Sequence, residues 1–199
     1  GRGQPVTRTE DPRLLTGRGS FVDNLNLPNQ AYAAVVFSTV AHADIKSIDT
    51  TAAEAAPGVI AVLTGAQADE DNLGDLPALF MPEDMGGPPG YRTMKPVMVR
   101  TRVRHVGERV ALVIADTAAQ AEEAADLILI DYDILPAVIR GTDAVKEGAP
   151  QLYDGAANNV SFTLRFGDEA ATDSAFATAH HITTLSLHNN RLATTAMEP

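Results

Sequence analysis

The chain has 199 residues and no cysteine, which excludes disulfides, thiolate metal ligands, iron–sulfur ligation and a cysteine nucleophile from it. Its formal net charge of −11 and sequence pI near 4.7 argue against a phosphate-binding surface, so we expect no nucleic-acid partner. No apolar run approaches the roughly 20 residues that cross a bilayer, and the polar start lacks the apolar centre of an export signal, so we expect a cytoplasmic protein without a membrane span.

The first predicted element is a short helix or turn within residues 8–19 (RTEDPRLLTGRG). Asp11 stands before Pro12, and a carboxylate at a helix start can accept hydrogen bonds from exposed backbone N–H groups while proline pre-sets φ. Gly17 and Gly19 then permit a sharp end to the turn.

Two strand–helix–strand units follow. After an apolar strand over residues 31–40 and a turn at 42–44, the first unit comprises a strand at 45–49, a helix at 51–56 and a strand at 59–63. The second comprises a strand at 109–115, a helix at 118–126 capped by Asp116 or Thr117, and a strand at 127–132. Such a unit normally packs its helix on one face of a sheet.

Residues 66–96 show no helical or strand periodicity and are rich in Asp, Gly, Pro and Met. A loop of this length inside a compact domain is either functional or mobile. Gly86, Gly87 and Gly90 lack the preceding strand and following helix of a phosphate-binding loop, and the neighbouring prolines remove N–H donors.

The last part of the chain has a new organisation. We predict a short helix at 143–146, a connector at 150–159, a strand at 161–166, a helix at 168–177 and a strand at 182–187. Residues 194–199 carry no stop signal, so we expect the protein to continue beyond them.

One basic stretch stands out in this acidic chain, and it contains Arg100, Arg102, Arg104 and Arg109 interleaved with valines. The pattern is typical of the solvent side of a strand, and contact with an anionic ligand is the alternative.

No histidine or carboxylate pattern assembles a site. His180 and His181 are adjacent and point to opposite faces of an extended segment, so they do not face one metal ion easily. The remaining histidines occur singly, at His42, His105 and His188. The acidic residues Glu122, Glu123, Asp131 and Asp133 fit an exposed helix face and strand alternation. The residues alone therefore indicate an acidic α+β protein without an assembled active site.

Four runs, in order, resemble the amino-terminal part of the large, molybdenum-binding subunit of the xanthine dehydrogenase, aldehyde oxidase and aerobic carbon monoxide dehydrogenase family. They are residues 8–25, residues 41–50 (AHADIKSIDT), residues 57–65 (PGVIAVLTG), and VGERVA at 106–111 leading to DY at 131–132 and LPAV at 135–138. The resemblance implies an α+β fold, with an α/β hammerhead domain over residues 1–152 whose two strand–helix–strand units lie on a mixed sheet. Residues 153–199 are then the truncated start of the molybdopterin-binding domain, with its first strands and helix.

The resemblance also implies the chemistry of the parent enzyme, which we expect to be carbon monoxide dehydrogenase-like. Such enzymes oxidise carbon monoxide, an aldehyde or an N-heterocycle with water at a molybdenum ion held by molybdopterin, here in its cytosine dinucleotide form. An FAD-binding medium subunit and a 2Fe-2S small subunit complete a heterotrimer, which forms a dimer. The glutamate base and pterin-binding loops of the family lie downstream, so the resemblance places no catalytic or metal-binding residue within this chain, which we expect to be inactive alone.

Three points stay open at this stage. Glu198, in the run Met197-Glu198-Pro199, is a candidate for cofactor contact, and a structural strand residue is the alternative. The hammerhead domain of the family resembles a packing module beside the substrate entrance, so the loop at 66–96 is a candidate for shaping a channel or a subunit contact. The alternative for the whole chain is a stand-alone, non-catalytic interaction module with a hammerhead fold.

Overall fold

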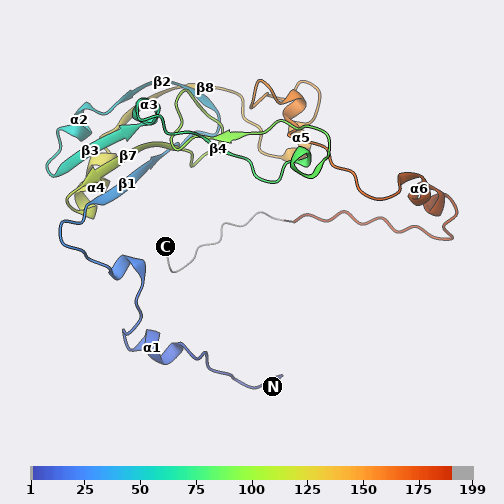
Figure 1. Ribbon diagram of the computed structural model, residues 1–199, viewed down its shortest axis with the longest axis horizontal. Coiled ribbons are helices and arrows are strands. Elements are labelled where there is room, and N and C mark those ends of the chain that lie inside the picture. Colours follow the sequence, from blue (N-terminus) through green and yellow to red (C-terminus); the bar gives the residue numbers. More distant parts are fainter. Residues whose placement is uncertain (1, 190–199) are drawn as a thin grey trace. The chain divides into compact units, whose positions relative to one another are not determined.

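The computed structural model describes residues 2–189, which are distributed over two units. One unit is continuous and spans Ala31–Asp168; the other combines Gly1–Gln30 with Glu169–Pro199. Figure 1 shows the strands, all of which belong to the continuous unit.

The continuous unit contains three small antiparallel sheets, with strand orders β1-β7-β3, β6-β2-β8 and β4-β5. The strand bounds are β1 Tyr32–Phe37, β2 Ala43–Asp49, β3 Val59–Thr64, β4 Leu76–Pro77, β5 Met94–Lys95, β6 Arg102–Val103, β7 Arg109–Ala115 and β8 Leu129–Ile134. The five longer strands confirm the predicted ones to within a few residues, although Ala43 and Asp44 belong to β2 and not to a turn.

The predicted mixed sheet is wrong, because every strand pair in the described residues is antiparallel. In each predicted strand–helix–strand unit, the strand before the helix and the strand after it belong to different sheets. Helix α2 (Thr51–Glu54) joins β2 of one sheet to β3 of the other, and α4 (Ala118–Ala125) joins β7 to β8. The connection through α2 is shorter than the dozen or so residues that a parallel crossover needs. The two strands of each unit therefore never become neighbours.

The larger core cluster lies where α2 and α4 pack against the β1-β7-β3 sheet, as Figure 1 shows for α4. Ala121 and Ala124 are buried on α4, whereas Ala118 is exposed. Thr117 caps the helix by accepting a hydrogen bond from the Gln120 N–H at 3.2 Å. Six buried residues make up the cluster: Ala53, Val62, Ala111, Val113, Ala124 and Ile128.

A second cluster connects the two larger sheets. It contains Ala43 of β2, Val103 of β6, Val110 of β7 and Val99. Ile48 and Ile130 pack against both clusters, so the interior is continuous from α4 to the β6-β2-β8 sheet.

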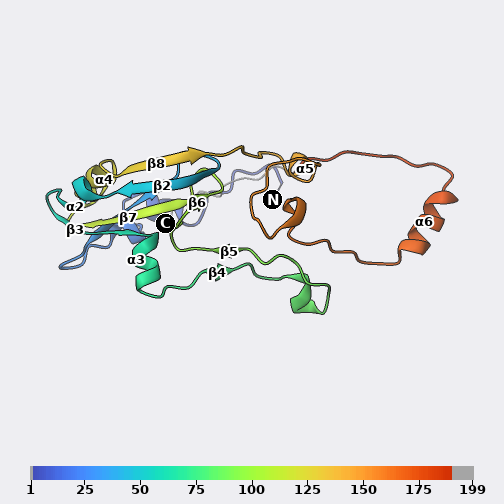
Figure 2. The same ribbon diagram turned by 90° about the horizontal axis from the view of Figure 1, so that it is seen from above.

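The segment at 66–96 contains more secondary structure than the sequence predicts. Helix α3 (Gly65–Glu70) begins directly after β3, and the Thr64 hydroxyl accepts from the Ala66 N–H at 3.3 Å. A hairpin of β4 and β5 follows, with the 3₁₀ helix η2 (Pro82–Met85) at its far end; Figure 2 shows β4 and β5 side by side. Strands of two residues are too short to give a periodic signal.

Beyond β8 the structure is mostly irregular. Helix α5 (Gly141–Ala144) lies slightly before its predicted position, and the 3₁₀ helix η3 (Ala157–Asn159) lies in the predicted connector. The strand predicted at 161–166 is wrong. The Tyr91 N–H donates to the Ser161 carbonyl at 2.7 Å and the Ser161 hydroxyl donates to the Tyr91 carbonyl at 2.9 Å, but no ladder forms.

In the described residues of the other unit there are three short helices: α1 Asp11–Leu15, the 3₁₀ helix η1 Val22–Asn24 and α6 Glu169–Ala177. Helices α1 and α6 confirm the prediction. Asp11, however, does not cap α1; the cap residue is Glu10, without a side-chain hydrogen bond, and the Asp11 carboxylate lies 3.7 Å from the Arg8 guanidinium. The strand predicted at 182–187 is absent, because no described segment pairs with it. No helix within residues 2–189 has the length and apolar content that a membrane crossing requires.

Candidate functional site

The histidines and carboxylates of residues 2–189 do not converge on a metal site, since no three of them lie close enough to hold an ion. His42 is buried, with Nδ1 2.7 Å from the Pro136 carbonyl oxygen. Its Nε2 atom and the hydroxyl of Tyr132 are the buried side-chain polar atoms that lack a hydrogen-bond partner in this range. One imidazole nitrogen and one phenol are too few to hold a metal ion, and no group of three potential ligands forms around them in the described residues.

The other histidines and the acidic candidates are exposed side chains. His105 is exposed, with Nε2 3.8 Å from a Glu108 carboxylate oxygen. His180, His181 and His188 are exposed in the other unit. Glu122 and Glu123 are exposed on α4, and Asp131 and Asp133 are exposed on β8.

Three of the four arginines in the basic stretch hold the fold together, which neither sequence interpretation anticipated. Arg102 pairs with Asp44 on the neighbouring strand at 2.5 and 3.0 Å. Arg100 bridges Asp69 of α3 and Asp75. Arg104 and Arg109 complete the set: the Arg104 guanidinium lies 4.5 Å from the centre of the Tyr153 ring, and Arg109 is exposed at the start of β7, as the solvent-side interpretation expects.

The ion pairs shift the pKa values of their carboxylates. The hydrogen bond from Arg102 lowers the pKa of Asp44 below its ordinary value, and the one from Arg92 does the same for the pKa of Asp84. Tyr153 is different, because its burial raises the pKa of the phenol. These groups are structural in character, and none of the three lies next to a nucleophile–base pair.

The segment at 76–95, which we call the hairpin segment, is held by Arg92. Its Nη1 atom donates to the Ala78 carbonyl at 2.6 Å, while Nη2 donates to Asp84 at 2.6 Å and to Glu83 at 3.3 Å. A second carboxylate oxygen of Glu83 accepts from the Gly90 N–H at 3.2 Å. The guanidinium thus ties both arms of the hairpin segment to η2.

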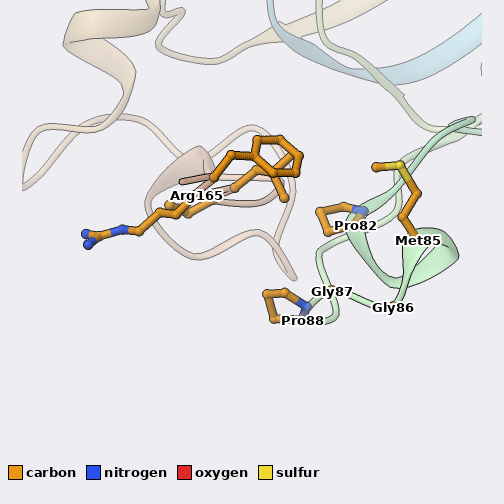
Figure 3. A pocket seen from close by; sticks show the side chains of 9 residues that line it. Pro82, Met85, Gly86, Gly87, Pro88 and Arg165 are labelled. Atoms are coloured by element: carbon orange, nitrogen blue, oxygen red, sulfur yellow. The ribbon is translucent and has the colours of Figure 1, made fainter. Parts of the chain in front are cut away.

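A shallow cleft lies beside η2 and holds about 420 Å³. Figure 3 shows Pro82, Met85 and Pro88 on one side of it, while the Arg165 side chain extends away from them. The lining is Pro82, Met85, Gly86, Gly87, Pro88, Thr163, Leu164, Arg165 and Phe166. This lining is suited to packing against an apolar surface and contains no nucleophile, general base or metal-ligand set.

Exposed apolar side chains continue along the hairpin segment. Leu79 and Phe80 are 75% and 80% exposed, and Phe80 adopts a φ of 59°, a conformation that costs energy for an aromatic residue. The sequence identified the loop at 66–96, which contains the hairpin segment, as a functional candidate by its length, but it did not indicate the arginine ties that shape the segment. Glu198, the candidate for cofactor contact, lies outside the described residues.

The two larger antiparallel sheets, joined to each other by the short helices α2 and α4, define an α+β hammerhead domain. The chain belongs to the family described as "Aldehyde oxidase and xanthine dehydrogenase, a/b hammerhead domain", which matches residues 16–136.

Its relatives are much longer proteins. The chain is 37% identical over 98% of its length to the nicotine 6-hydroxylase large subunit of Paenarthrobacter nicotinovorans, and 35% identical over 85% to the carbon monoxide dehydrogenase large chain of Hydrogenophaga pseudoflava. These alignments span 23% and 21% of the two relatives.

Solved structures show the same relationship. Quinoline 2-oxidoreductase from Pseudomonas putida 86 matches 90% of this chain with a TM-score of 0.72 and 39% identity. Carbon monoxide dehydrogenase from Oligotropha carboxidovorans matches 90% with a TM-score of 0.71 and 32% identity. Each match covers 22% of the solved chain.

Proposed function

We propose that these residues form the amino-terminal part of a molybdenum hydroxylase large subunit of the carbon monoxide dehydrogenase-like group. The observation that carries the proposal is the alignment of 98% of the chain, at 37% identity, with less than a quarter of an enzyme large subunit. A separate interaction module that shared only the hammerhead fold would not be expected to align over 98% of its own length with such a subunit.

In this proposal residues 1–152 are the hammerhead domain and residues 153–199 begin the molybdopterin-binding domain. The segments at 161–166 and 182–187 have strand-like sequences but no ladder in the described residues, which is the condition expected of strands whose partners come from later in a chain. Glu198 remains a candidate for cofactor contact in the completed domain.

The parent enzyme is proposed to carry molybdopterin cytosine dinucleotide, which supplies the oxidising centre when bound, with water as the oxygen source. An FAD-binding medium subunit and a 2Fe-2S small subunit are proposed to accept the electrons, in a dimer of heterotrimers. The names of two relatives, a "large subunit" and a "complex subunit gamma", support a multi-subunit enzyme. The described residues provide a folded support and no group that touches the reacting atoms.

The experiment is to express the complete reading frame that contains these residues together with the neighbouring subunit genes. We expect the purified complex to contain molybdenum by mass spectrometry and to reduce an artificial electron acceptor with one member of a panel of nicotine, quinoline, an aldehyde and carbon monoxide. The 199-residue chain alone serves as the control and is expected to be inactive. A complete reading frame that ends near residue 199, or yields a protein without molybdenum, contradicts the proposal.

The hairpin segment has a proposed role of its own, as a contact surface toward the rest of the large subunit or a partner subunit. Its exposed Leu79 and Phe80, held in place by the Arg92 ties, support this role. Replacing residues 79–88 by a Gly-Ser linker in the complete enzyme should reduce assembly or turnover. Unchanged turnover, substrate preference and subunit stoichiometry would show that the segment is dispensable.

A further inference from the structure

A second pocket lies on the opposite part of the hairpin segment from η2, where β5 meets the start of β7. It holds about 420 Å³, which is within the range of small-molecule sites. Its lining comes from several separate parts of the chain: Phe37, Met94, Lys95, Pro96, Val99, Arg104, His105, Gly107, Glu108, Arg109 and Tyr153.

The lining carries positive charge within a strongly acidic chain. Lys95, Arg104 and Arg109 are permanent cations at neutral pH, and Glu108 is the sole carboxylate among the lining residues. Glu108 is already engaged, because it accepts from the Arg104 backbone N–H and lies 3.8 Å from His105. The three cations still outnumber the one carboxylate in the lining.

Two of the cations have no counter-ion. Neither Lys95 nor Arg109 makes an ion pair with any residue that the structure describes. The third, Arg104, is fixed by a hydrogen bond from Nε to the Leu152 carbonyl at 2.8 Å and by its position over Tyr153. By contrast, Arg92, Arg100 and Arg102 all have carboxylate partners.

The remaining wall of the pocket is apolar. Phe37 lies directly opposite Arg109 in the β1–β7 pairing and is 52% exposed, and Met94, Pro96 and Val99 continue the apolar surface. A ligand that satisfies the whole lining carries one compact negative group and an apolar body. An inorganic anion satisfies only the cations, and a neutral aromatic molecule satisfies only the apolar wall.

We propose that this pocket binds a small organic carboxylate with an apolar body, of the size of benzoate. The carboxylate is held by Arg109 and Lys95, and the apolar body packs against Phe37 and Met94. This inference goes beyond the proposed function and does not depend on it, because every lining residue belongs to the unit Ala31–Asp168.

The test is isothermal titration of the 199-residue chain with benzoate, with benzamide and inorganic phosphate as comparison ligands. We expect saturable benzoate binding with a Kd of about 1 mM or tighter, and at least tenfold weaker binding of the other two. Arg109→Gln and Lys95→Gln should each weaken benzoate binding about tenfold, since each removes a charged hydrogen-bond donor.

The matched control is Arg140→Gln, which removes the same charge from an exposed arginine outside the pocket and should leave the Kd unchanged. Circular dichroism of each variant checks that the fold is intact, and raising the salt from 0.02 to 0.5 M should weaken benzoate binding to the native chain more than to Arg109→Gln. The proposal is overturned by absence of saturable binding, by equal affinity for benzamide or phosphate, or by equal loss in the Arg140 variant. Binding of an acidic peptide without binding of benzoate also overturns it.

Discussion

Arg102 and Asp44 face each other directly across β6 and β2, and they form a two-point ion pair in which Nε and Nη2 donate to the two carboxylate oxygens at 2.5 and 3.0 Å. The Arg102 side chain is 25% exposed and that of Asp44 is 41% exposed. Because β6 has only two residues, few backbone hydrogen bonds hold it to the β6-β2-β8 sheet. The Arg102–Asp44 ion pair therefore contributes a large part of the interaction that holds β6 to β2.

We predict that Asp44→Asn lowers the thermal unfolding midpoint by a few degrees, because the variant removes the two-point ion pair and leaves Asp154, at 3.7 Å, as the carboxylate near Arg102. The measurement is a circular dichroism melt. Asp133→Asn is the matched control, since Asp133 is registered opposite Asp44 on β8 but lies 3.9 Å from its partner, Lys46, in an exposed pair. Equal shifts of the unfolding midpoint in both variants would mean that the two-point geometry adds no stability.

Acid should weaken the fold through the same carboxylates. The pKa values of Asp44 and Asp84 lie below the ordinary 3.8 in the folded chain, so the unfolded chain binds protons first. Their stabilisation is complete above pH 3.8 and is lost as the pH falls through the folded pKa values. Urea unfolding between pH 6 and 2.5 should show this loss as a fall in the free energy of unfolding. In a double variant, Asp44→Asn with Asp84→Asn, the free energy of unfolding should fall less steeply toward acid pH. The same pH dependence in the native chain and the double variant would contradict the role of these two carboxylates.

Gly65 should be intolerant of any side chain. A Cβ atom there would lie 2.5 Å from the Val99 carbonyl oxygen, which belongs to the backbone and cannot rotate away. We predict that Gly65→Ala costs about 1–3 kcal/mol of unfolding free energy. Gly74→Ala, where a Cβ meets no atom within 4 Å, should change it by less than about 0.5 kcal/mol. Urea denaturation of both variants checks the difference, and equal midpoints would show that α3 moves freely away from the Val99 backbone.

The sequence was sufficient for elements whose signal is local. Residues 109–115 form β7 as predicted, because a nearly continuous apolar run at the centre of a sheet needs no information from elsewhere in the chain. The segments at 161–166 and 182–187 also have strand-like sequences. A strand, however, needs a hydrogen-bonded neighbour, and none is found for either segment in the described residues. A strand-like sequence indicates that a segment can pair in a sheet, but it does not indicate whether a partner strand lies beside it.

The hairpin segment and the arginine ties were beyond sequence reasoning for a different reason. Arg100 reaches Asp69 and Asp75 across 31 and 25 positions, and Arg102 reaches Asp44 across 58. No spacing rule links residues so far apart, because their proximity is set by the tertiary fold, in the case of Arg102 and Asp44 by the β2–β6 pairing. The family resemblance supplied the correct fold despite this, but it placed the strands on one mixed sheet where the chain forms separate antiparallel ones.

Removal of the Arg92 tie should loosen the hairpin segment without unfolding the sheets. Lysine cannot reproduce the three hydrogen bonds of Arg92 to Ala78, Glu83 and Asp84, so Arg92→Lys should free the carboxylates that hold η2. The N–H groups of Met81 and Gly90 donate to those carboxylates and are the natural reporters.

We predict that hydrogen exchange at Met81 and Gly90 becomes about tenfold faster in Arg92→Lys, because losing one charge-assisted hydrogen bond changes a local opening equilibrium by about that factor. Exchange at Val113, in the middle of β7, is the internal control and should not change. Exchange by mass spectrometry with peptide resolution is sufficient to separate the two regions. If Val113 accelerated together with Gly90, the hairpin segment would be part of the same cooperative unit as the sheets; if neither changed, Arg92 would not be what holds η2 in place.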